Sequence, residues 1–128
     1  MANRYGEVAL LAARMETYGK ALTAAERWQD AVRRLYPTTP AAQKKAAPRA
    51  AFLGLCEAGL VQGVAAGNAT QPNRNKDYAV EAVRLLREDA RRSISQLWAA
   101  VSDQTAAEHA SQMDVVLALW KNGLIVPD

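Results

Sequence analysis

The stretch from His109 to Asp114 contains the side-chain types of a serine hydrolase, because His109, Ser111 and Asp114 lie within six residues. In a catalytic triad, the serine and the aspartate both hydrogen-bond to one imidazole. The spacing of Ser111 and Asp114 is instead that of a helix N-cap and its reciprocal acceptor. We interpret this stretch as the start of a helix. His109 remains the group best suited to acid–base work if the protein is an enzyme.

The single cysteine and the three tryptophans are candidates for redox chemistry or stacking, yet their positions favour packing. Cys56 lies in an apolar helical stretch, away from any helix start or cation that would lower its pKa. Trp28, Trp98 and Trp120 fall on apolar helical stripes and are predicted to lie in the core. With one Cys and one His, no metal site built from several thiolates or imidazoles is possible, and we expect neither a metal nor a cofactor.

Basic residues are concentrated in the middle of the chain, although the net charge is only +3. Between Arg33 and Cys56 there are five basic residues and no acidic one, and Arg74 and Lys76 form a second small cluster. Such clusters attract phosphates or acidic partners. The alternative is a solvated surface that keeps the protein soluble.

A polar segment, 67–78, precedes the fourth expected helix and is longer than a plain connection requires. Its amide side chains suit the recognition of bases, peptide backbones or sugars, and equally suit turns and helix caps. Together with the basic residues, it supplies the candidate binding residues, which are Lys44, Lys45, Arg49, Asn68, Asn73, Arg74, Asn75, Lys76 and Tyr78.

Six stretches of the chain carry the apolar spacing of a helix that buries one face. Half of the 128 residues are hydrophobic and 23% are charged, so the composition is that of one soluble globular domain. No stretch alternates as a strand would, although 59–64 could be a short extended piece. We therefore predict an all-α fold. The apolar stripes begin at Val8, Trp28, Phe52, Ala79, Ile94 and Val116.

Capping residues define where these helices begin and end. Thr23 and Glu26 have the spacing of a capping box. Gly59 and Gly123 stand where a left-handed residue ends a helix, each followed by an apolar pair. The other expected signals are Pro40 opening a short turn through Lys45, Pro48 in a first helical turn, Asn75 or Asp77 capping the fourth helix, and Ser111 capping the sixth.

The third and sixth expected helices match each other in sequence. Residues 51–61 align without gaps on 115–125, and both stretches end in Gly-Leu followed by Val or Ile. This match predicts an internal duplication of two three-helix halves, 3–61 and 76–125, joined by a linker, 62–75, within one domain, 1–128. The alternative is that the match reflects only the apolar spacing that any two amphipathic helices share, without a duplication. Under duplication, these two helices, apolar nearly all round, form the centre.

Nothing in the sequence predicts export or a membrane span. Residues 1–7 lack the apolar stretch of a signal peptide, and no apolar run of about 18 residues occurs. We therefore expect a soluble, cytoplasmic protein without a membrane partner, in which the lone thiol stays reduced.

Three stretches, 51–61, 67–79 and 111–120, resemble a family of small bacterial proteins of unknown function. This resemblance implies a bacterial origin and no particular activity. A looser likeness is to trihelical DNA-binding units, because a helix that ends in Gly-Leu-Val or Gly-Leu-Ile resembles the end of a recognition helix. The chain departs from that pattern, since neither helix offers a row of polar or basic residues to base edges.

The sequence therefore favours a non-catalytic interaction module that binds an unidentified protein or small molecule between its two halves, with the segment 67–78 at the rim. The alternative is a nucleic-acid-binding protein whose phosphate contacts come from the basic residues, Arg33 and Arg34 included. A third hypothesis is an enzyme with a site that sequence patterns do not reveal.

Overall fold

The computed structural model describes residues 4–15, 22–64, 74–102 and 111–127. Within these ranges the chain forms seven helices and no strand, which confirms the all-α prediction. The helices make one compact domain around a shared core. They are α1 (Tyr5–Arg14), α2 (Ala24–Leu35), α3 (Pro40–Gln43), α4 (Ala46–Glu57), α5 (Arg74–Glu88), α6 (Ile94–Val101) and α7 (Gln112–Lys121).

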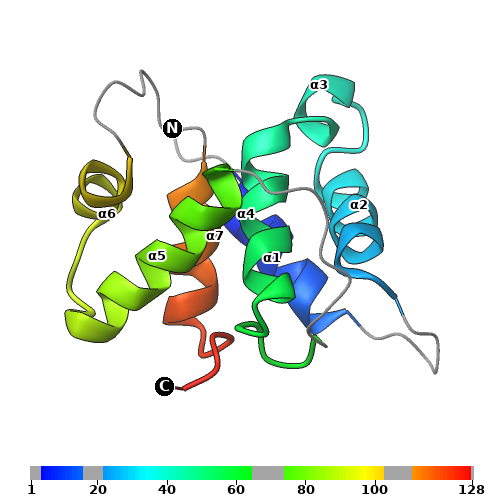
Figure 1. Cartoon of the computed structure of the whole chain (residues 1–128). Helices are drawn as coiled ribbons and strands as arrows, with labels where there is room; N and C mark the ends of the chain where they lie inside the picture. The colour runs from blue at the N-terminus through cyan, green and yellow to red at the C-terminus, as the bar shows by residue number, and fades with distance from the viewer. Residues whose placement is uncertain (1–3, 16–21, 65–73, 103–110, 128) are drawn as a thin grey trace.

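Helices α4 and α7 occupy the centre, as their apolar sequences predict. They lie side by side, with α1 crossing behind them and α5 crossing in front (Figure 1). Most of α4 is buried, including Phe52 and Leu55, and α7 buries Val116 and Leu119. Helices α2 and α6 lie on opposite flanks of this arrangement (Figure 1).

Both central helices end as expected, on glycines with left-handed backbones. Gly59 has φ 75° and Gly123 has φ 72°. The amide of Leu60 donates to the carbonyl of Leu55 at 3.0 Å, and that of Leu124 donates to Leu119 at 2.9 Å. These bonds satisfy carbonyls at the helix ends, as in the Schellman motif.

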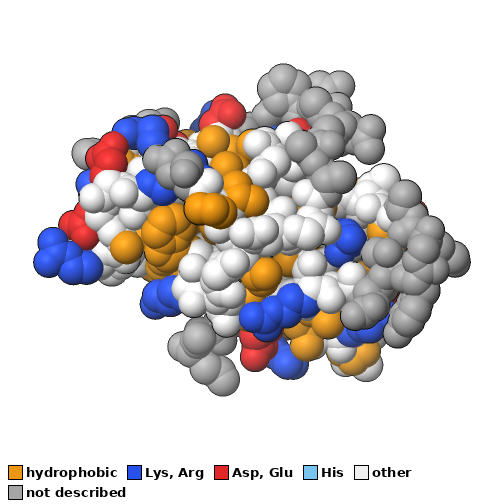
Figure 2. Space-filling view, turned by 90° about the horizontal axis from the view of Figure 1, so that it is seen from below, with side chains coloured by type: hydrophobic (Ala, Val, Ile, Leu, Met, Phe, Trp, Pro, Cys, Tyr) orange, Lys and Arg blue, Asp and Glu red, His pale blue; other side chains and the backbone are white. Residues whose placement is uncertain are grey.

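The segments after these glycines pair with each other. Val61 and Ile125 form an isolated antiparallel bridge, with flanking amide bonds from Gln62 to Leu124 (2.7 Å) and from Val126 to Leu60 (2.8 Å). The expected extended piece at 59–64 is thus a single bridge that ties the ends of α4 and α7 together. At this end of the molecule, hydrophobic side chains reach the surface in several groups, with Lys and Arg side chains around them (Figure 2).

Capping boxes begin both flanking helices. Thr23 and Glu26 form the predicted box at α2, with bonds of 2.9 and 3.1 Å. Ser93 and Gln96 form a second one at α6, with bonds of 2.8 and 3.1 Å. The Ser-x-x-Gln spacing that signals this second box is present in the sequence, although only the box at Thr23 was predicted.

Two predicted caps are wrong. Helix α5 already includes Arg74, so Asn75 and Asp77 lie in its first turn, and Arg74 and Asn75, which the sequence placed in the linker, are helical. Ser111 does precede α7, but its backbone is left-handed (φ 77°) and its side chain makes no cap hydrogen bond, so the box with Asp114 does not form. A capping side chain needs an extended backbone to reach the free amides, and this backbone is not extended.

Of the three tryptophans expected in the core, only Trp28 is fully buried. Its ring lies 5.4 Å from that of Phe52, between centroids. Trp98 and Trp120 are half-buried at the edge of the core. The apolar stripe therefore gave the correct side of each helix but not the depth of burial, because Trp98 belongs to the flanking helix α6 and Trp120 to the last turn of α7.

Two helix crossings place a glycine directly against the neighbouring helix. A Cβ built on Gly6 of α1 would lie 3.0 Å from the Cβ of Ala118 in α7. One built on Gly54 of α4 would lie 2.6 Å from the Cβ of Lys76 in α5 and 2.7 Å from its Cα. If α1 corresponds to α5 and α4 to α7, these crossings are equivalent, as duplication requires. The duplication itself stays a prediction.

None of the helices in the described ranges is long and apolar enough to cross a membrane.

The α4–α5 crossing yields a stability test. Gly54→Ala gains about 1 kcal/mol of helix propensity, but the new methyl group collides with backbone and should cost about 3 kcal/mol. Gly6→Ala makes the same chemical change against a less crowded neighbour. We expect urea denaturation, followed by tryptophan fluorescence, to show that Gly54→Ala lowers the unfolding free energy by about 2 kcal/mol and that Gly6→Ala lowers it by less. Equal losses would contradict the close α4–α5 contact.

Candidate binding surface

The predicted basic residues of the middle segment lie where α2 ends, α3 forms and α4 begins. This corner is held by side-chain bonds to backbone carbonyls. Gln43 Nε2 donates to the carbonyl of Tyr36 at 2.6 Å, and the Tyr5 hydroxyl donates to the carbonyl of Ala42 at 2.9 Å. The two bonds attach the short helix α3 to the end of α2 and to α1. They therefore fix the backbone from which Lys44 and Lys45 extend.

Five cations lie exposed at this corner, and we call them the basic surface: Arg33, Arg34, Lys44, Lys45 and Arg49. Arg34 pairs with Asp30 at 2.9 Å, one turn earlier on α2. Lys45 places its ammonium 5.8 Å from the centroid of the Tyr5 ring. In the described part of the chain, Arg33, Lys44 and Arg49 have no carboxylate within 4.0 Å.

The other predicted binding residues do not join this surface. Arg74 is exposed at the start of α5, whereas the Asn75 side chain accepts a 2.7 Å bond from Gln112 Nε2. The Tyr78 ring packs edge-on against Trp98, with centroids 5.3 Å apart. Both side chains therefore connect α5 to neighbouring helices. Asn68 and Asn73, and also His109, lie outside the described residues.

Lys76 is the predicted binding residue whose surroundings differ most from an open surface. Its side chain is only 11% exposed and forms an ion pair with Glu57 of α4, with Nζ 3.0 Å from Oε2. Its backbone lies against Gly54. These contacts place Lys76 within the α4–α5 contact, and its role in binding stays a prediction.

Cys56 is buried, as predicted. Loss of hydration raises the pKa of its thiol to about 12, with a smaller contribution from Glu57, while Arg27 acts in the opposite direction. A thiol with this pKa carries almost no thiolate at neutral pH, so it is a poor nucleophile. Its location in the core of α4 agrees with a packing role.

Arg27 itself is a buried cation that the sequence analysis missed. Its Nη1 donates to the carbonyls of Ala12 (3.0 Å) and Met15 (3.3 Å), where α1 ends. A guanidinium suits these carbonyls because they carry the partial negative charge of a helix C-terminus. Arg27 thereby fixes α2 against α1.

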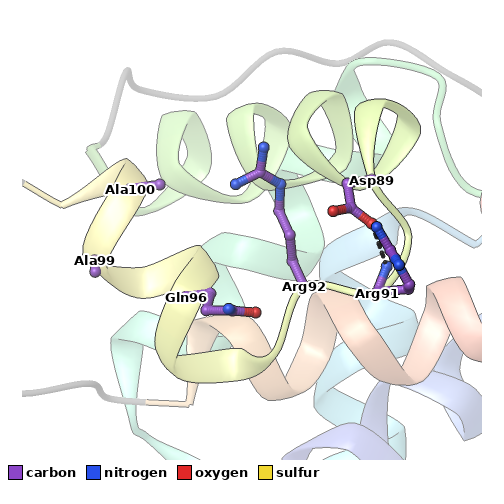
Figure 3. Close-up of a pocket in the computed structure, with 6 residues that line it drawn as sticks. All are labelled: Asp89, Arg91, Arg92, Gln96, Ala99 and Ala100. Carbon is purple, nitrogen blue, oxygen red and sulfur yellow. Dashed lines mark hydrogen bonds and ion pairs between the residues drawn. The ribbon is translucent and has the colours of Figure 1, made fainter.

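An open hollow of about 710 Å³ lies over α6 and the turn before it, away from the basic surface (Figure 3). Its lining includes Arg91, Arg92 and Gln96. A second hollow, of about 720 Å³, shares both arginines and extends to α7. No residue of this region was among the predicted binding residues, and its only signals in the sequence are the Asp-Ala-Arg-Arg turn and the uncharged helix after it. In the described ranges, no three His, Cys, Asp or Glu side chains are grouped as a metal site would require.

The buried ion pair can be tested directly. Glu57→Gln removes the carboxylate that pairs with Lys76, and we expect a loss of about 2 kcal/mol of unfolding free energy, because a largely buried ammonium loses its counter-charge. Lys76→Met should cost a similar amount. The double variant should cost less than the sum of the two, as measured by denaturant unfolding in a double-mutant cycle. Purely additive losses would show that the two groups do not interact.

Comparison with known proteins gives a family but no function. No curated protein and no solved structure matches the chain. A family model described as "Family of unknown function (DUF6979)" matches residues 2–126, nearly the whole chain. The protein therefore belongs to this family of unknown function, in agreement with the resemblance noted in its sequence.

Proposed function

We propose that the protein is a non-catalytic binding module that docks an acidic partner protein on the basic surface. The observation that carries the proposal is the lack of neutralisation at this corner. No acidic residue occurs between Ala31 and Cys56, and Arg33, Lys44 and Arg49 have no carboxylate nearby in the described structure. The proposal includes the expected cytoplasmic location.

The opposite flank has a different pattern of charge. On α5 and the turn after it, Arg84 and Arg91 each bond directly to a carboxylate. Such pairs cancel most of each other's field outside the molecule. Cations without partners leave a positive potential, which speeds encounter with an acidic surface and orients it.

The geometry of the corner supports an interaction surface. The cations come from the end of α2, the start of α4 and the connection between them, and the bonds of Tyr5 and Gln43 hold this connection to α1 and to the end of α2. A preorganised array loses less entropy on binding than one on a loose loop.

The alternative partner is a nucleic acid, which the same cations would attract through its phosphates. Helix α3 has only four residues. Of the basic surface, only Arg49 belongs to α4, near its start, while Lys45 directly precedes that helix. A helix that reads base edges carries polar or basic side chains along its length. We therefore favour an acidic protein and make nucleic acid an outcome of the test.

The test compares two double variants that each remove two positive charges. Lys44→Ala with Arg49→Ala changes the basic surface and leaves Lys45 on the Tyr5 ring. Arg14→Ala with Lys121→Ala changes exposed cations elsewhere. Binding of a fluorescent polyglutamate peptide, followed by anisotropy, should weaken roughly fivefold to thirtyfold in the first variant, because exposed charge pairs contribute about 0.5–1 kcal/mol each. The second variant should bind almost as the unmodified protein does.

The same titrations with duplex DNA and with RNA, at two salt concentrations, separate the alternatives. Stronger binding to either nucleic acid than to the peptide, with a steep salt dependence, would replace our proposal with the nucleic-acid function. Equal losses in the two double variants would show that only net charge matters, and the basic surface would then have no specific role.

A further inference from the structure

The turn between α5 and α6 holds its two arginines in different ways. The Asp89 carboxylate accepts bonds from both the backbone amide and the Nε of Arg91, at 3.0 and 3.1 Å, through one oxygen. Figure 3 shows Arg91 folded onto Asp89, whereas Arg92 extends away from both. These bonds lower the pKa of Asp89, since they stabilise its charged form. The carboxylate of the hollow is therefore engaged in shaping the turn.

The guanidinium of Arg92 is hydrogen-bonded through its Nε atom. Its Nε donates to the carbonyl of Leu85 at 3.3 Å. The nearest carboxylate oxygen, Oε1 of Glu88, is 3.8 Å from Nη2, and the other oxygen of Glu88 is bonded to Arg84. The side chain of Arg92 is 30% exposed and lines the hollow. The hollow thus contains a fixed, partly desolvated guanidinium without a carboxylate at hydrogen-bond distance in the described structure.

Helix α6 supplies an uncharged floor beside this arginine. No charged residue occurs from Ile94 to Val101, and the exposed side chains of the helix are those of Ser95, Gln96, Ala99 and Ala100. Gln96 uses its oxygen to accept from the Ser93 amide, so its Nε2 remains a donor. Helix α2 on the other flank exposes Arg33 and Arg34, as a solvated helix usually does.

We propose that this hollow is a second binding site, for a peptide segment of a partner protein in which one Glu or Asp is flanked by small apolar residues. The carboxylate pairs with the Nη groups of Arg92, and Gln96 Nε2 donates to it. The small apolar side chain packs on Ala99 and Ala100. An arginine fork matches a carboxylate in shape and charge, and partial burial strengthens the pair. The site lies apart from the basic surface and does not depend on the function proposed for it.

The test uses the full chain, with amide and arginine Nε resonances followed by NMR. The probe is the capped tripeptide Ala-Glu-Ala, and its control is the capped tripeptide Ala-Gln-Ala. The glutamate peptide should shift the Arg92 Nε–H and the amides of Gln96, Ala99 and Ala100. The amide peptide should bind at least about tenfold more weakly, as expected for the loss of a charged bond of about 1.5 kcal/mol.

A pair of variants tests the site without touching the bond from Arg92 to Leu85. Ala100→Glu places a carboxylate in the hollow, where it pairs with Arg92 and should abolish peptide binding. Ala100→Gln adds nearly the same volume without charge, and this variant should retain most of the peptide binding. The proposal is overturned if the two tripeptides bind alike, if both variants behave alike, or if acetate alone shifts the same resonances as strongly as the peptide. Loss of binding in the Lys44→Ala, Arg49→Ala variant would likewise overturn the claim of a separate site.

Discussion

The close contact of α4 with α5 at Gly54 constrains much of the rest of the structure. Because Gly54 has no side chain, the backbone of Lys76 lies directly against α4, and the ammonium of Lys76 reaches the carboxylate of Glu57. This contact joins the two predicted halves of the chain. It also sets the path of the first turn of α5, so Asn75 meets Gln112 of α7 and Tyr78 meets Trp98 of α6.

The same contact explains why the predicted binding residues separate into two groups. Asn75, Lys76 and Tyr78 are polar and follow a stretch rich in Asn and Gln, a composition that in a sequence is typical of an exposed rim. Once Lys76 packs on Gly54, these side chains turn toward neighbouring helices. Lys44, Lys45 and Arg49 have no such glycine beside them and stay at the surface. Whether a polar side chain faces solvent or a neighbouring helix thus depends on a contact with a residue distant in the sequence.

Local patterns in the sequence predicted local structure well. The capping box at Thr23, the glycine ends at Gly59 and Gly123, and the central position of α4 and α7 follow from spacing alone. The sequence did not predict the left-handed Ser111, the buried Arg27 or the hollow at Arg92. The burial of Arg27 and the hollow depend on how two helices meet, and one helical stripe carries no information about the crossing of another. A left-handed backbone is unusual for a serine, so the residue type at 111 did not signal it.

The two flanks differ in a way that bears on function. Helices α2 and α6 both begin with a capping box. Arg27, within α2, bonds carbonyls at the end of α1, and Arg92, in the turn before α6, bonds a carbonyl in the last turn of α5. Arg27 is buried, however, whereas Arg92 borders an open hollow. The outer face of α2 is charged and that of α6 is neutral. Because the flanks differ in charge and lie on opposite sides of the central helices, a partner on the proposed basic surface would not obstruct one at the proposed hollow.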